Sequence, residues 1–186
     1  MNDRDLAPSS TALRGLTTCV VRSAWLLARG RVHLPRRNIG MRLKFANGTT
    51  AWVFRETVAD HHVADPCVLV VEFRLRLVGG FGHVLFRWES ILNTPLFVGF
   101  PGFVTKLWMS HDEHGTYRGV YEWDGADAAR YYARCLIWLL ALVCVPNSIR
   151  YHVLPGLRRD EFIARSAPAA SAAMDATESW RVTGTT

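Results

Sequence analysis

The sequence predicts an α+β fold, because segments between residues 67 and 154 carry strand, hairpin and helix patterns in turn. Residues 68–77 alternate apolar and polar side chains, as expected of a strand with one buried face. Residues 103–123 contain two β-rich runs around Gly115, which is typical of a hairpin with a long loop. An alanine-rich helix pattern follows directly. This order combines strands and helices in one mixed domain.

The first predicted strand is followed by a helix. One face of the strand is apolar, whereas the other carries Glu72 and Arg74. Gly79 and Gly80 end the strand, and apolar residues then recur at helical spacing up to Asn93. The apolar positions of this predicted helix are Phe81, Val84, Leu85, Trp88, Ile91 and Leu92.

The hairpin consists of the runs 103–109 and 117–123, and Asp124 then occupies the position of a helix N-cap. The helix is apolar nearly all round between Cys135 and Val145, so we expect the N-terminal extension or another subunit to cover it. Pro146 is predicted to end this helix.

Residues 149–154 form the last predicted strand. The elements from residue 67 onward therefore have the order of a ferredoxin-like βαββαβ unit.

Segments outside this unit divide the chain further. Residues 1–12 and the tail 164–186 lack apolar periodicity, and we predict that both are disordered. Residues 13–66 form an N-terminal extension, and residues 67–163 form the ferredoxin-like domain. A helix is predicted at 13–29, packed on the domain or, alternatively, docked on anionic lipid at a membrane surface.

A second hairpin is predicted around Asn47-Gly48, a strong signal for a tight turn. It can extend the sheet, cover a barrel edge or lie over a ligand entrance, and the first two roles are favoured because sheet edges need protection. Lys44 and Arg55 are expected to be exposed and to lie outside any ligand site.

Composition excludes several classes of protein. The formal net charge is +6, and the basic residues are 20 arginines and only two lysines. The arginines are scattered along the chain. This distribution does not predict a nucleic-acid-binding stripe. The four cysteines are far apart and predict reduced thiols in the cytoplasm, not a structural zinc site. No apolar run reaches the roughly 20 residues of a membrane-spanning helix.

Residues 100–132 resemble the YdhR-like branch of the antibiotic-biosynthesis monooxygenase superfamily, the dimeric α+β barrels. The resemblance implies a homodimer with a ligand cavity beside its sheets. It also implies a cofactor-independent monooxygenase that acts on aromatic or polyketide-like compounds, although the family includes haem-degrading relatives and members without a known reaction. The matching residues are Pro101, Gly102, Phe103, Lys106, Leu107, Trp108, Gly119, Val120, Tyr121 and the segment Ala128–Tyr132.

Strand alternation suggests a site on the sheet face away from the helices. We predict that this face carries Glu72 and Arg74 from the first strand and, from the hairpin, Lys106, Trp108, Gly119, Tyr121 and Trp123. The aromatic rings would stack on a flat, hydroxylated aromatic molecule, and the carboxylate would take its proton. Lys106 or Arg74 would hold the resulting enolate or phenolate. In the alternative interpretation, the charged residues form cross-strand ion pairs and the rings pack a dimer core.

Further candidates lie near this predicted site. Asn93 would donate an amide to an oxyanion, or it would act as a helix C-cap. The remaining candidates for substrate binding are Trp123, His83 and Trp88.

The histidines do not predict a metal site. His61, His62, His111 and His114 lie in predicted loops without a ligand spacing, so no metal is expected. His83 and His152 are the candidates for a haem axial ligand, but we expect no cofactor.

These observations predict a monooxygenase or a related small-molecule-binding protein for a hydrophobic aromatic ligand. The alternative is a noncatalytic dimeric ligand-binding or interaction protein whose N-terminal extension sets its location.

Overall fold

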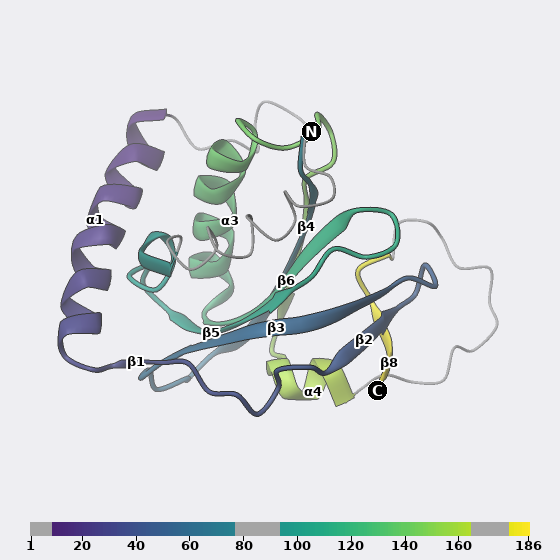
Figure 1. Cartoon of the computed structure of the whole chain (residues 1–186). Helices are drawn as coiled ribbons and strands as arrows, with labels where there is room; N and C mark the ends of the chain where they lie inside the picture. Colours follow the sequence, from purple (N-terminus) through teal and green to yellow (C-terminus); the bar gives the residue numbers. More distant parts are fainter. Residues whose placement is uncertain (1–8, 77–93, 165–178) are drawn as a thin grey trace.

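A computed structural model of the chain describes residues 9–76, 94–164 and 179–186. These residues form an α+β fold built on a curled antiparallel sheet (Figure 1). The predicted helix at 81–93, with the candidate residues His83, Trp88 and Asn93, lies outside the described residues.

Every pairing between the described strands is antiparallel, and the sheet order is β7-β4-β6-β5-β3-β2-β8, with β1 paired to β3. The predicted hairpin of β5 and β6 is confirmed, and the strand predicted at residues 149–154 is β7, although it is not the last strand because β8 follows it. The hairpin around Asn47-Gly48 extends the sheet, because β3 pairs with β5. The strands are β1 (Val32–His33), β2 (Arg42–Phe45), β3 (Thr50–Ala59), β4 (Pro66–Arg74), β5 (Phe103–Met109), β6 (Thr116–Asp124), β7 (Arg150–Pro155) and β8 (Val182–Thr185).

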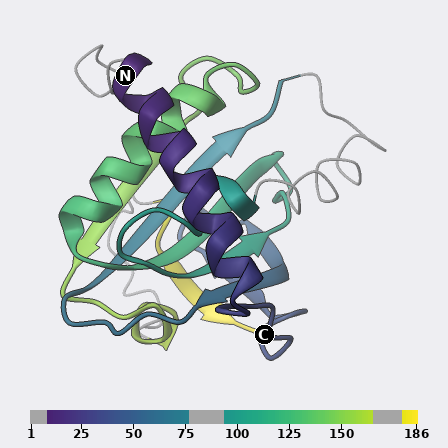
Figure 2. The ribbon, with the colours of Figure 1, turned by 90° about the vertical axis from the view of Figure 1, so that its left-hand side faces the viewer.

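Helices α1 (Ser9–Ala28) and α3 (Ala126–Leu140) lie on one face of the sheet, whereas the short helix α4 (Arg159–Ala164) lies on the other (Figure 1). Seen from the side, α1 is the outer layer, in front of the strands and beside α3 (Figure 2). The short 3-10 helix η2 (Thr94–Leu96) packs against α1. The prediction of a helix near the N-terminus is confirmed, although it begins at Ser9.

The two ends of α3 differ from the prediction. Gly125, not Asp124, is the N-cap residue. The Asp124 carboxylate instead accepts hydrogen bonds from the backbone N–H groups of Ala64 and Asp65, at 2.9 and 2.8 Å. The helix ends at Leu140, well before Pro146, and a turn at residues 141–143 follows it. Leu142 and Val143 are 65% and 49% exposed in this turn, so the predicted burial of the whole apolar run is wrong.

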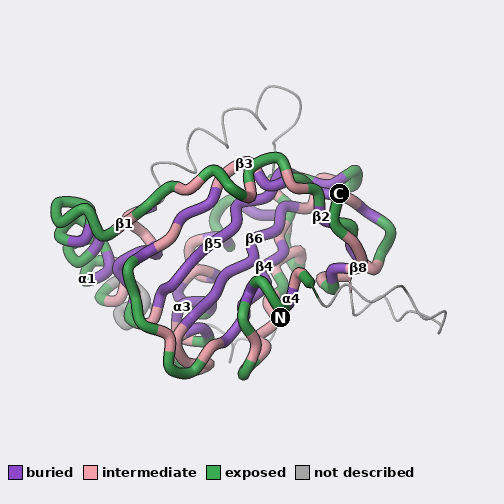
Figure 3. Tube along the Cα trace, turned by 90° about the horizontal axis from the view of Figure 1, so that it is seen from below, coloured by how far each residue is buried: buried purple, intermediate pink, exposed green. Residues whose placement is uncertain are grey.

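The sheet buries a separate apolar core on each face. Strand alternation divides β4 between them: Leu69 and Val71 face the first core, whereas Val68 and Val70 face the second. The first core lies under α1 and α3. The second lies under β2, β8 and α4. The central strands are therefore buried along most of their length (Figure 3).

The C-terminal segment corrects the prediction of a disordered tail. Residues 179–186 are ordered against the second core, where β8 pairs with β2 and Val182 is buried. The Trp180 ring stacks on His152 with a centroid distance of 4.8 Å. The sequence did not predict this strand, because residues 179–186 are mostly polar and contain only two strongly apolar residues, Trp180 and Val182.

Buried ion pairs link the strands and α4 around the second core. The Arg118 guanidinium donates to Glu72 at 2.8 Å and to Asp112 at 2.7 Å. The guanidinium of Arg159, the first residue of α4, donates to the Glu56 carboxylate on β3 at 2.8 Å and thereby attaches α4 to the sheet. These charges are paired and hydrogen-bonded, as burial requires.

The C-terminal strand should contribute strongly to stability. We expect Val182→Asp to lower the free energy of unfolding by about 3 kcal/mol, because it buries an unpaired carboxylate in the second core. Thr185→Asp, at an exposed position of the same strand, is the matched control. Urea unfolding measures both, and equal midpoints for the two variants would show that β8 does not pack as described.

Candidate functional site

The strand register overturns the predicted grouping of site residues. Tyr121 pairs directly with Leu69 on β4 and with Lys106 on β5, and residues paired in this way lie on one face. Lys106, Tyr121 and Trp108 therefore lie on the face under α1 and α3. Glu72 and Arg74 lie on the opposite face. The prediction that the hairpin residues share a face with Glu72 and Arg74, away from the helices, is wrong, because the hairpin of β5 and β6 was assigned the wrong phase relative to β4.

Glu72 and Arg74 occupy positions that do not reach this face. Glu72 is buried in the second core, where it pairs with Arg118 and accepts a hydrogen bond from Ser179 at 3.2 Å. Arg74 is exposed at the end of β4, and its backbone N–H donates to the Ser148 hydroxyl at 3.2 Å. The alternative interpretation of cross-strand ion pairs is thus correct for Glu72.

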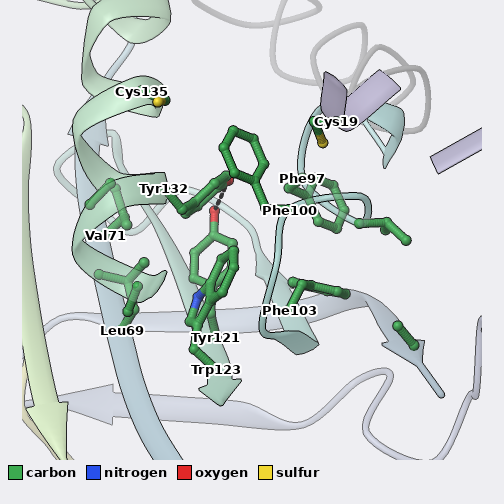
Figure 4. Packing of buried hydrophobic residues seen from close by; sticks show 14 of the residues in the cluster. Cys19, Leu69, Val71, Phe97, Phe100, Phe103, Tyr121, Trp123, Tyr132 and Cys135 are labelled. Carbon is green, nitrogen blue, oxygen red and sulfur yellow. Dashed lines mark hydrogen bonds between the residues drawn. The ribbon is translucent and has the colours of Figure 1, made fainter. Parts of the chain in front are cut away.

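Lys106 lies in a cluster of aromatic rings. Its Nζ is 3.1 Å from the ring centroid of Trp108, 4.6 Å from that of Phe97 and 4.8 Å from that of Tyr121. The side chain is only 6% exposed. We call Lys106, Arg55 and these three aromatic residues the Lys106 cluster. Figure 4 shows Phe97 and Tyr121 within the surrounding packing.

The Lys106 amine is buried beside a second cation, Arg55. Among the residues that the structure describes, no carboxylate forms an ion pair with it. Burial, and to a smaller extent the charge of Arg55, hold the pKa of Lys106 well below its usual range. The ring faces attract a cation, but they do not replace the lost hydration. The neutral form of Lys106 is therefore favoured more than in an exposed lysine.

Arg55 belongs to the cluster, contrary to the prediction that it is exposed and remote. It is half-buried, lies 5.4 Å from the centroid of the Trp108 ring and donates to the Thr94 hydroxyl at 2.7 Å. Strict alternation would place Arg55 on the same face as Val53, in the second core. The register shifts between these two residues, and this irregularity turns Arg55 toward Trp108. No signal in the sequence reveals the shift.

Trp108 is held in one orientation. Its indole N–H donates to the Thr57 hydroxyl at 3.1 Å, and its ring contacts that of Phe97 at a centroid distance of 5.2 Å. The ring therefore forms a fixed wall of the cluster.

Tyr121 supplies a hydroxyl beside the cluster. The Tyr132 hydroxyl donates to the Tyr121 hydroxyl at 3.4 Å (Figure 4). Burial raises the pKa of both phenols, so both stay protonated near neutral pH. Gly119 makes room for the Tyr121 ring, because a Cβ there would lie 2.8 Å from a ring carbon. The role of Tyr121 beside a ligand stays a prediction.

Trp123 is a core residue. It is fully buried, and its ring packs on that of Tyr132 at a centroid distance of 4.8 Å. Its indole nitrogen has no hydrogen-bond partner within the described ranges. We therefore assign it to packing beneath α3 and not to the Lys106 cluster.

The described histidines lie away from this cluster. His152 is on the second face, where its Nε2 is 3.9 Å from Glu72, so it is not placed to bind a haem near Lys106. His61 contacts Asp124 at 3.1 Å. Within the described ranges there is no group of three metal-ligating side chains.

Comparisons with family models, curated proteins and solved structures found no match to this chain. No helix in the described part of the chain is long and apolar enough to cross a membrane.

Burial of Lys106 should cost stability. We expect Lys106→Met to raise the free energy of unfolding at pH 7 by about 1–3 kcal/mol, because the apolar side chain needs no polar partner. At pH values between the lowered pKa of Lys106 in the folded protein and the usual lysine pKa of about 10.4, Lys106 is protonated in the unfolded chain but not in the folded one. Wild-type stability therefore rises with pH there, and the advantage of Lys106→Met shrinks. Urea unfolding from pH 6 to 10 measures this.

Lys44→Met is the control, because Lys44 is exposed. It should change neither the stability nor its pH dependence. If Lys106→Met is less stable than wild type at every pH, burial of Lys106 does not lower the stability of the protein, and this prediction is wrong.

Proposed function

We propose that the Lys106 cluster binds a planar, weakly acidic aromatic compound, such as a phenol or an enol, and accepts its proton. The observation that supports this proposal is the buried amine of Lys106, which is enclosed by three aromatic rings and lies beside Arg55. The part of the chain described here supplies no carboxylate to it. An acidic ligand would provide the missing negative charge.

The aromatic rings suit the body of such a ligand. Trp108 and Phe97 meet edge to face at an interplanar angle of 65°, so they present ring surfaces in two directions. Flat aromatic molecules pack well against such surfaces. The fixed orientation of Trp108 reduces the entropy lost on binding.

The charges suit a proton transfer. A neutral amine accepts a proton from a phenol or an enol, and the resulting ammonium pairs with the anion. Arg55 keeps its charge and adds a second cation near that anion. In a site shielded from water these interactions are stronger than in solution.

This proposal reassigns two roles predicted from the sequence. Lys106, not Glu72, accepts the proton, because Glu72 lies on the other face in an ion pair with Arg118. Arg55, not Arg74, supplies the additional cation.

A cofactor-independent monooxygenase is the reaction that we propose for this site. An electron-rich aromatic anion reacts with oxygen itself, so the protein supplies deprotonation, charge stabilisation and shielding. The strand order β7-β4-β6-β5 supports the ferredoxin-like βαββαβ interpretation and hence the resemblance to the YdhR-like proteins. If oxygen does not react, the same site is that of a carrier.

A homodimer stays a prediction of the resemblance. The packing argument for a partner subunit is weaker, since α1 packs on α3 and β2, β8 and α4 cover the second face.

Ligand binding tests the proposal. We expect 2-naphthol to quench tryptophan fluorescence and to bind wild type and Lys44→Met equally. Lys106→Met should weaken this binding by about 1–3 kcal/mol, because the proton acceptor is lost. The same variant should bind 2-methoxynaphthalene, which has no acidic proton, as tightly as wild type does. Trp108→Phe should weaken the binding of both ligands.

Oxygen consumption in buffer free of metal ions then separates an oxygenase from a carrier. Failure of naphthols and phenols to bind wild type, together with unchanged fluorescence in all variants, would show that the cluster is core packing.

As a second candidate function we propose association with an anionic membrane surface through α1. The outer face of this helix exposes Val20, Val21, Trp25 and Leu27, at 41%, 67%, 47% and 46%. The helix has no acidic residue. Arg14 and Arg22 are exposed as well, and the Arg29 guanidinium lies 4.9 Å from the Trp25 ring centroid. An apolar face with only basic flanks complements anionic lipid headgroups.

Co-sedimentation with vesicles tests this second candidate. The protein should bind phosphatidylglycerol vesicles, bind phosphatidylcholine vesicles weakly, and dissociate as salt rises. Val21→Glu should reduce binding at least tenfold. Leu142→Glu, at an exposed apolar position outside α1, should leave it unchanged. Dimerisation that Val21→Glu abolishes, without vesicle binding, would assign the face to a second copy of the chain.

A further inference from the structure

We propose that Lys106 also captures aromatic aldehydes and ketones by forming an imine through its Nζ. This inference rests on the proposed function in one respect: a planar aromatic ligand must reach the Lys106 cluster. It goes further because it assigns a covalent reaction and a second class of ligand to the same amine.

The surroundings of Nζ favour a nucleophile. A lysine in water is an ammonium ion, whose lone pair is blocked by a proton. Here three rings enclose the nitrogen, the guanidinium of Arg55 lies nearby, and no carboxylate of the described residues pairs with it. The amine consequently keeps its lone pair at a pH where other lysines do not.

The chain offers a matched internal control. It contains two lysines, Lys106 and Lys44. Lys44 is exposed on β2, whereas Lys106 is buried on β5. The two amines therefore have the same chemistry and opposite surroundings.

The reaction balances without a cofactor. The lone pair of Nζ forms a bond to the carbonyl carbon, and the carbonyl π pair moves to the oxygen, which takes up the proton that the nitrogen releases. The carbinolamine then loses its hydroxyl group as water, and a carbon–nitrogen double bond forms. The Tyr121 hydroxyl gives a proton to the departing hydroxyl group and takes back the proton that the nitrogen releases as the double bond forms. It accepts a hydrogen bond from Tyr132, and its own proton has no acceptor among the described residues.

The cluster also indicates which carbonyl compounds fit. An aromatic ring packs against Trp108 and Phe97, and a neighbouring phenolate lies near the charge of Arg55. Aromatic aldehydes with a hydroxyl group beside the carbonyl have both features. We choose 2-hydroxy-1-naphthaldehyde as the probe.

Borohydride trapping tests the inference. Wild-type protein is incubated with a low concentration of the probe at pH 7 and reduced with sodium borohydride, and the modified lysine is located by peptide mass spectrometry. We expect Lys106 to be modified at least tenfold faster than Lys44. Lys44→Met should keep the adduct, whereas Lys106→Arg, which retains a charge but has no primary amine, should lose it.

Two results overturn the inference. Modification confined to Lys44 and the N-terminus, while 2-naphthol still binds, would reject imine formation and leave the proposed function intact. Absence of both the adduct and naphthol binding would reject the two together. Because the wild-type peptide map alone locates the adduct, the test holds even if the Lys106→Arg variant does not fold.

Discussion

Burial of the hairpin of β5 and β6 on both faces is the constraint on which the rest of the structure depends. Every residue of β5 is buried, and so are the seven central residues of β6. A strand in this position needs a covering layer on each side. Helices α1 and α3 form one layer. The other consists of β2, β8 and α4, and it draws the C-terminal residues into the fold.

The same constraint forces polar side chains of the hairpin into the interior. On the second face these groups are paired: Arg118 binds Glu72 and Asp112, and Glu122 accepts a hydrogen bond from the backbone of Arg159 at 3.1 Å. Lys106 faces the first core, where its neighbours among the described residues include three aromatic rings and Arg55. A buried amine without a counter-charge among the described residues costs stability, and ionisable groups in such surroundings cluster at functional sites. This contrast between the two faces supports a ligand site at Lys106.

Local sequence patterns predicted many of the elements. The alternation in residues 68–77, the Gly115 loop and the Asn47-Gly48 turn identified β4, the β5–β6 hairpin and the β2–β3 hairpin, because these signals depend on neighbours in the chain. The ends of α3 were less predictable. Asp124 resembles an N-cap, but its carboxylate binds the backbone of Ala64 and Asp65, which only the folded chain brings close.

The sequence by itself determined that Lys106, Trp108 and Tyr121 have the spacing to share a strand face, since side chains two apart on a strand and residues paired across a hairpin point the same way. Only the tertiary structure decided which face this is. The register of β4 against β6 places these three residues on the face of the sheet opposite to the face that carries Glu72. An irregularity in β3 brings Arg55 next to them. Both depend on pairings between distant segments, where a shift of one residue exchanges the two faces of a strand.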